Sequence, residues 1–74
     1  MTDIQMQAVE SSNLSAVGYD PAGKTLRVAF KNGGVYDYSE VPVDVFTALG
    51  SAESIGGAFH KLVKTAGFKY ERRN

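Results

Sequence analysis

The chain contains no cysteine, a single histidine and only two prolines in its 74 residues. Without cysteine, disulfide bonds, thiolate zinc sites and cysteine nucleophiles are all excluded. No apolar run approaches the roughly 18 residues that a membrane-spanning helix requires. The first residues include an acid and no apolar run, so they do not resemble a secretory signal. We therefore expect a cytoplasmic protein with no membrane association.

An excess of charge of either sign is also absent, because eight basic residues balance eight acidic ones. The charges are nevertheless unevenly placed, with a net charge of −4 over residues 1–60 and +4 over residues 61–74. Neutrality excludes a strongly basic domain but not a local basic patch. The hydrophobic content of 43% suits a globular chain. A chain this short can form one domain of modest stability, and oligomerisation is one way to add buried area.

The first half of the sequence has the alternating pattern of short strands separated by turns. The expected strands are residues 13–19, 26–30 and 35–38. Pro21 and Gly23 favour a turn after the first strand. Asn32-Gly33 is a strong hairpin signal between the other two, since both residues tolerate a positive φ. Residues 6–9 are a candidate for a further, short edge strand.

After residue 41 the apolar period becomes helical, and Pro42 suits a first helical turn. A short helix ending at Gly50 would place three apolar residues on one side: Val43, Phe46 and Leu49. A longer helix would bury one stripe: Ile55, Phe59, Leu62, Val63 and Ala66. Ser51 or Ser54 could serve as its N-cap and Gly67 as its C-cap.

These elements predict an α+β domain, in which an antiparallel three-stranded meander packs against one short and one longer helix. Residues 68–72 alternate again, as either a final strand or a frayed tail. We divide the chain into an N-terminal segment (1–8), the domain (9–67) and a basic C-terminal tail or short strand (68–74).

The order of these motifs resembles the KTSC domain family, whose hallmark is a Tyr-x-Tyr step. The matching residues are Ser11-Ser12, residues 16–20 and 26–30, Gly33-Gly34-Val35, Tyr36-Asp37-Tyr38, Val41-Pro42, and residues 52–56 with Phe59. The resemblance implies a small domain that occurs alone in bacteria and phages. It also implies kinship with the C-terminus of some lysyl-tRNA synthetases, from which RNA binding is the usual suggestion.

The candidate binding residues are aromatic and basic: Tyr36, Tyr38, Arg27, Lys61, Lys64 and Lys69. Tyr36 and Tyr38 share one face of their strand. They form either an exposed platform that stacks bases or a cover for the sheet beneath the helices. Four acidic residues occupy a stretch with no basic residue: Asp37, Glu40, Asp44 and Glu53. They would repel phosphate if they lay on the same surface as the tyrosines.

No catalytic grouping is apparent. His60 has no convergent partner, so a surface histidine is favoured over an acid–base or metal-binding one. Gly56-Gly57 lacks the Lys-Ser/Thr of a phosphate loop. Glycine in a first helical turn costs about 1 kcal/mol relative to alanine, which suggests close approach by a neighbouring segment or a bound partner.

We predict no catalysis, metal or cofactor. A protein-interaction module (a homodimer, adaptor or inhibitor) is favoured, with an RNA-binding accessory domain as the alternative.

Overall fold

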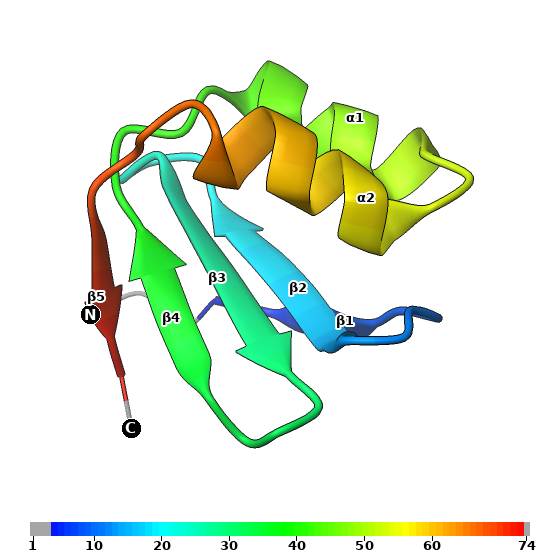
Figure 1. The fold of residues 1–74 in the computed structure, drawn as a ribbon. Helices are drawn as coiled ribbons and strands as arrows, with labels where there is room; N and C mark the ends of the chain where they lie inside the picture. The colour runs from blue at the N-terminus through cyan, green and yellow to red at the C-terminus, as the bar shows by residue number, and fades with distance from the viewer. Residues whose placement is uncertain (1–3, 74) are drawn as a thin grey trace.

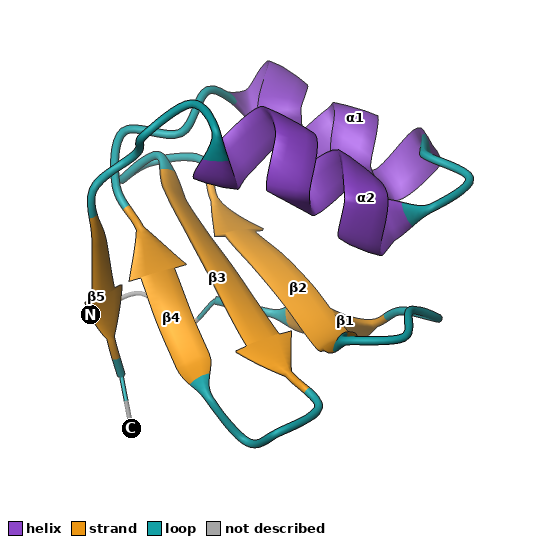
Figure 2. Cartoon of the chain, in the orientation of Figure 1, coloured by secondary structure: helices purple, strands orange, loops and turns teal. Residues whose placement is uncertain are grey.

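The turns of the first half fold the chain into a sheet that the two helices then cover. The computed structural model describes residues 4–73. The elements are β1 (Met6–Ala8), β2 (Leu14–Asp20), β3 (Thr25–Phe30), β4 (Val35–Tyr38), α1 (Val43–Ser51), α2 (Ile55–Phe59), the π-helical turn η1 (His60–Lys64) and β5 (Tyr70–Arg72). Both helices lie over the same face of the sheet, as Figures 1 and 2 show. The class is therefore α+β, as predicted.

The sheet has five strands in the order β1-β2-β3-β4-β5, and each pairs antiparallel with the next along the chain. The predicted three-stranded meander forms its centre. The candidate edge strand near residues 6–9 is present as β1, and the candidate last strand is present as β5. At the predicted hairpin Gly33 adopts a φ of 99°, and the amide of Phe30 donates to the carbonyl of Gly34 at 2.8 Å.

The strand register decides which side chains face the helices. Leu26 pairs with Tyr38 and Val28 with Tyr36. Leu26, Val28 and Tyr38 are buried, so this row faces the helices. Successive side chains of a strand point to opposite faces. The intervening residue Arg27 therefore lies on the helix-free face.

Helix α1 begins after Pro42, whose ψ of 149° is extended and whose carbonyl accepts from the amide of Val45 at 3.0 Å. Leu49 is buried and Phe46 stacks on Tyr19 with ring centroids 5.3 Å apart. Val43, which was grouped with these two residues on one side of the helix, is 52% exposed.

The second helix follows the predicted stripe up to its C-terminal end. Ile55, Phe59 and Val63 are buried, and the Ser54 hydroxyl caps the helix by accepting from the amide of Gly57 at 3.3 Å. Regular α-helix stops at Phe59 and continues as η1, closed by the bond from the amide of Thr65 to the carbonyl of His60 at 3.1 Å. The predicted extension to residue 66 is therefore absent, and Ala66 is exposed.

Close packing explains why a glycine, Gly56, stands at the start of this helix. A Cβ built on Gly56 would lie 2.7 Å from Oδ1 of Asn13 and 2.9 Å from Oγ of Ser11. The loop before β2 thus approaches the helix closely, which is the neighbouring segment that the sequence suggested.

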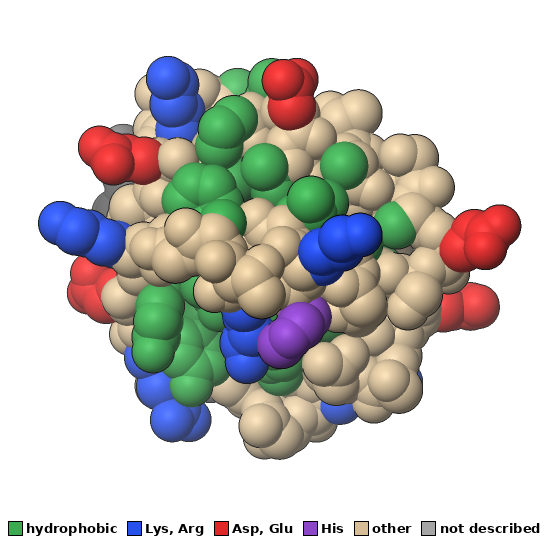
Figure 3. All heavy atoms as spheres, turned by 45° about the horizontal axis from the view of Figure 1, so that its top comes forward, with side chains coloured by type: hydrophobic (Ala, Val, Ile, Leu, Met, Phe, Trp, Pro, Cys, Tyr) green, Lys and Arg blue, Asp and Glu red, His purple; other side chains and the backbone are tan. Residues whose placement is uncertain are grey.

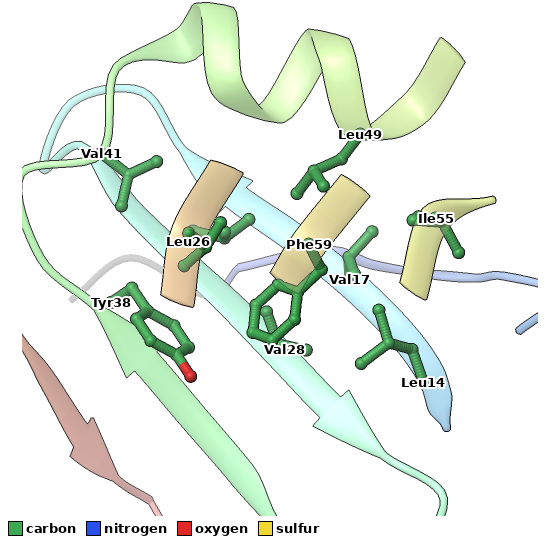
Figure 4. Close-up of a cluster of buried hydrophobic side chains, with 10 residues drawn as sticks. Leu14, Val17, Leu26, Val28, Tyr38, Val41, Leu49, Ile55 and Phe59 are labelled. Atoms are coloured by element: carbon green, nitrogen blue, oxygen red, sulfur yellow. The ribbon is translucent and has the colours of Figure 1, made fainter. Parts of the chain in front are cut away.

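The core lies between the helices and the central strands. Its buried members are Leu14, Val17, Leu26, Val28, Tyr38, Val41, Leu49, Ile55, Phe59 and Val63 (Figure 4). Phe59 occupies its centre, meeting the rings of Tyr38 and Phe30 edge-on with centroids 5.5 Å and 5.6 Å apart. On the side of β4, the core is therefore bounded by aromatic side chains.

Candidate functional site

An aromatic hollow of about 480 Å³ opens where the end of the second helix passes over β4 and β5. Five rings line it: Phe30, Tyr36, Tyr38, Phe68 and Tyr70. Val63, Lys64 and Gly67 complete the lining, and Gly67 adopts a φ of 78° in the turn that leads toward β5. The hollow is thus built from the meander, the π turn and the C-terminal strand together.

The three tyrosines of this hollow differ in how far they reach the solvent. Tyr38 is only 4% exposed and belongs to the core, Tyr36 is half-buried, and Tyr70 is 63% exposed. The ring of Tyr70 contacts both others, with centroids 5.8 Å from Tyr36 and 5.4 Å from Tyr38. Burial raises the pKa of Tyr38, and the neighbouring Tyr70 and Tyr36 raise it further. An aromatic surface therefore reaches solvent mainly through Tyr70, with Tyr36 as its floor.

A second hollow, of about 490 Å³, adjoins the first and shares Phe30, Tyr36 and Lys64 with it. Its remaining residues are Ser12, Asn13, Lys31 and Asn32. We call it the amide hollow. The carboxamide oxygen of Asn32 accepts from the amide of Gly34 at 2.9 Å, and that of Asn13 accepts from the Ser11 hydroxyl at 2.9 Å. The loop before β2 and the β3–β4 hairpin therefore bring polar groups beside the aromatic rings.

Basic side chains border these hollows. Lys64 lines both, and the guanidinium carbon of Arg72 lies 5.8 Å from the ring centroid of Tyr36. Among residues 4–73, no aspartate or glutamate lines either hollow. Figure 3 shows hydrophobic and basic side chains gathered on the helix-bearing side, with acidic ones toward the edges of the view. The charged side chains that line the two hollows are therefore basic.

The structure brings some of the predicted site residues together and separates others. Tyr36, Tyr38 and Lys64 meet in the aromatic hollow. Lys61 and Lys69 are exposed, and neither lines the hollows just described. Of the predicted lysines Lys61, Lys64 and Lys69, the hollow is therefore lined by Lys64 alone.

Arg27 lies on the helix-free face, where it binds Asp37. Its Nε and Nη2 donate to the two carboxylate oxygens at 2.7 Å and 3.0 Å. Nε of Arg73 approaches the same carboxylate at 3.4 Å. The carboxylate between the two tyrosines is thus paired on the opposite face from their rings, so it does not oppose an anion in the hollow.

Part of the remaining acidic charge collects elsewhere. Glu10 and Glu53 line a third hollow of about 400 Å³, which also includes residues of β1, β2 and α1. Two acidic residues thus lie at a different hollow from Lys31 and Lys64. His60 is exposed at the start of the π turn. Within the described residues, no three side chains of the metal-binding types gather at one place, and no helix has the length and apolarity to cross a membrane.

Sequence reasoning did not place Tyr70 and Arg72 in the site. The available signal was the alternation of residues 68–72, which puts Tyr70 and Arg72 on one face of a strand. The register confirms this, since Tyr38 pairs with Tyr70 and Tyr36 with Arg72.

These observations define a small α+β domain with a five-stranded meander, two helices on one face and an aromatic hollow at one end. The sequence matches the KTSC domain family over residues 10–68. The chain belongs to this family, as its motifs suggested. It is similar in structure to a KTSC domain protein of Yersinia pestis, with a TM-score of 0.91 and 32% identity, covering 97% of this chain and 100% of that one.

Relatives in sequence are of two kinds. One is an uncharacterised protein of Stutzerimonas stutzeri, 40% identical over 65 residues that make up 88% of this chain and 92% of that protein. Another is a lysine–tRNA ligase of Nostoc, 41% identical over 63 residues, which are 85% of this chain but 11% of the ligase. The domain thus resembles both a small protein and a short segment of a much longer enzyme.

Proposed function

We propose that this KTSC domain is a non-catalytic binding module that holds single-stranded RNA in the aromatic hollow. One observation carries the proposal: Tyr36 and Tyr70 line a hollow whose charged neighbours, Lys64 and Arg72, are cations. Bases stack on aromatic rings whatever their identity, and cations hold the phosphates between them. This combination is the usual requirement for binding a single strand.

The charges favour an anionic aromatic ligand over other occupants of an aromatic hollow. An aromatic cage suits a quaternary ammonium group when its rings stand without competing cations. Here Arg72 already lies beside the ring of Tyr36, and Lys64 lines the wall. A cationic ligand would be repelled, whereas a nucleotide presents both a ring to stack and a phosphate to neutralise.

The similarity to lysine–tRNA ligases supports RNA over DNA. Those enzymes are named for a tRNA substrate, and the related segment makes up 11% of the Nostoc ligase. A domain with a basic, aromatic hollow would serve there as an accessory contact for RNA.

We test the proposal by titrating a fluorescently labelled oligouridylate with the protein at low salt and following anisotropy. Replacing Tyr70 with alanine is expected to weaken binding about tenfold, because stacking contributes about 1–3 kcal/mol per base. Val43→Ala is the matched control, since Val43 is also more than half exposed and lies on α1 away from the hollow. Neither change removes a buried side chain.

The binding is also expected to weaken steeply as salt is added. The proposal fails if the folded wild-type protein gives no anisotropy change with the oligonucleotide or with tRNA at low salt. Equal effects of Tyr70→Ala and Val43→Ala would show that binding occurs at another surface.

A protein partner or a second copy of the chain is a second candidate, and it would use the helix-free face of the sheet. That face carries Ala29 beside the Arg27–Asp37 pair, whereas residues 4–6 pack over Gly18. Both helices of the described chain lie on the opposite face (Figure 2). Light scattering across a range of concentrations checks self-association: a constant monomer mass would count against a homodimer.

A further inference from the structure

We propose that the aromatic hollow and the amide hollow act as one groove that binds successive nucleotides of the strand, with Lys64 on the phosphate between them. This inference rests on the proposed function and extends it by defining the length of the ligand. The two hollows share Phe30, Tyr36 and Lys64, so a ligand can pass from one to the other without leaving the surface.

The volumes suit one nucleotide in each hollow. Sites for small ligands and cofactors have volumes of about 300–1,000 Å³. The hollows measure about 480 Å³ and 490 Å³, and each falls within this range. A single mononucleotide would fill one hollow and leave the other empty.

The two hollows offer different chemistry. The aromatic hollow presents ring faces, which stack any base. In the amide hollow the carboxamide oxygens of Asn13 and Asn32 already accept hydrogen bonds from Ser11 and Gly34. Their amide groups therefore offer N–H donors, which match the phosphate and carbonyl oxygens of a nucleotide. Lys31 adds a positive charge at this end.

Lys64 holds the position at which the two nucleotides would join. It projects from the π turn, a helical irregularity that is frequent at functional sites. It makes no ion pair with any residue in the described part of the chain. Its ammonium group is thus available to a phosphate that links a stacked base to its neighbour.

If the amide hollow holds a second nucleotide, Lys31, which lines that hollow and not the aromatic one, should matter only for ligands longer than one nucleotide. We compare uridine monophosphate with oligouridylates of increasing length, using the wild-type protein and the Lys31→Gln and Tyr70→Ala variants. Lys24→Gln is the matched control, because it removes the same charge from the turn at the opposite end of β3 (Figure 1).

The wild-type protein is expected to bind a trinucleotide more tightly than the monophosphate. Lys31→Gln should weaken trinucleotide binding about three- to tenfold, as expected for one charge-assisted contact, and leave monophosphate binding unchanged. Tyr70→Ala should weaken both ligands. Circular dichroism of each variant confirms that the fold is retained.

Two outcomes would overturn the inference while leaving the proposed function in place. In one, Lys31→Gln and Lys24→Gln have the same effect on the trinucleotide. In the other, affinity does not rise beyond the monophosphate. By contrast, failure of every RNA ligand to bind the wild-type protein would remove the proposed function itself.

Discussion

Tyr38 serves the core and the candidate site with the same side chain. Its ring contacts the buried ring of Phe59 and also the exposed ring of Tyr70, whose centroid lies 5.4 Å from that of Tyr38. Such offset and edge-on ring pairs contribute about 0.5–1.5 kcal/mol each beyond their burial. Tyr38 therefore joins the core to the hollow, where the exposed ring of Tyr70 lies against it.

The environment of Tyr38 predicts a loss of stability at alkaline pH. Burial raises the pKa of Tyr38 in the folded state, so the folded protein holds this proton more tightly than the unfolded chain does. The resulting stability is fully present below about pH 10, the unfolded value, and is lost as the pH rises through the folded pKa. Urea unfolding from pH 8 to 11 measures this fall.

Tyr38→Phe provides the comparison, because phenylalanine keeps the ring and has no proton to lose. The alkaline fall in unfolding free energy should be smaller in the variant than in the wild type. Tyr19, whose pKa burial also raises, accounts for part of the remaining fall. Identical pH profiles for the two proteins would contradict the assigned role of Tyr38.

At the scale of elements, the two edge strands are short and depend on particular contacts. Strand β5 pairs antiparallel with β4. Two further backbone hydrogen bonds flank this pairing: the amide of Ser39 donates to the carbonyl of Lys69 at 2.8 Å, and the amide of Arg73 donates to the carbonyl of Val35 at 2.7 Å. Strand β1 depends instead on Gly18 of β2, with which Met6 pairs.

We predict that Gly18→Ala destabilises the protein. A Cβ at this position would lie 2.5 Å from the carbonyl oxygen of Gln5 and 2.7 Å from Cγ2 of Ile4, so the backbone before β1 would have to move. A cost of about 1–3 kcal/mol is expected, as for other overpacked sites. Thermal or urea unfolding measures it.

Gly50→Ala is the matched control, because nothing lies within 4 Å of a Cβ at this position in α1. It should stabilise the helix by up to about 1 kcal/mol. If Gly18→Ala were as stable as the wild type, the close packing of residues 4–6 on β2 would be wrong.

Periodicity was sufficient to predict the central strands and both helices, because each has a buried face. It could not decide between strand and tail for residues 68–72, since all three residues of β5 are exposed. For the same reason Tyr70 was missed. Helical spacing aligned Val43 with Phe46 and Leu49 but could not indicate that Val43 would be 52% exposed.

The site was predictable in composition but not in arrangement. The Tyr-x-Tyr step and Lys64 were both recognised in the sequence. The position of Asp37 was not, because the register of β3 and β4 alone places its carboxylate beside Arg27 on the other face. Alternation within β4 sets Asp37 on the face opposite the tyrosines, but its partner Arg27 depends on pairing between strands, which no single strand reveals.

At the scale of the whole molecule, charge and shape divide the surface into distinct regions. The aromatic and amide hollows carry cations, a third hollow carries Glu10 and Glu53, and the helix-free face carries the paired Arg27 and Asp37. A neutral chain of 74 residues thereby offers a locally positive groove. We propose that single-stranded RNA binds in this groove and on no other surface.

The most direct test is to map the binding surface by NMR, following backbone amide shifts of the labelled protein as oligouridylate is added. We expect shifts concentrated at the residues of the two hollows, above all Tyr36, Lys64 and Tyr70. Shifts concentrated at Arg27, Ala29 and other positions of the helix-free face, or a spectrum that RNA leaves unchanged, would contradict binding in this groove.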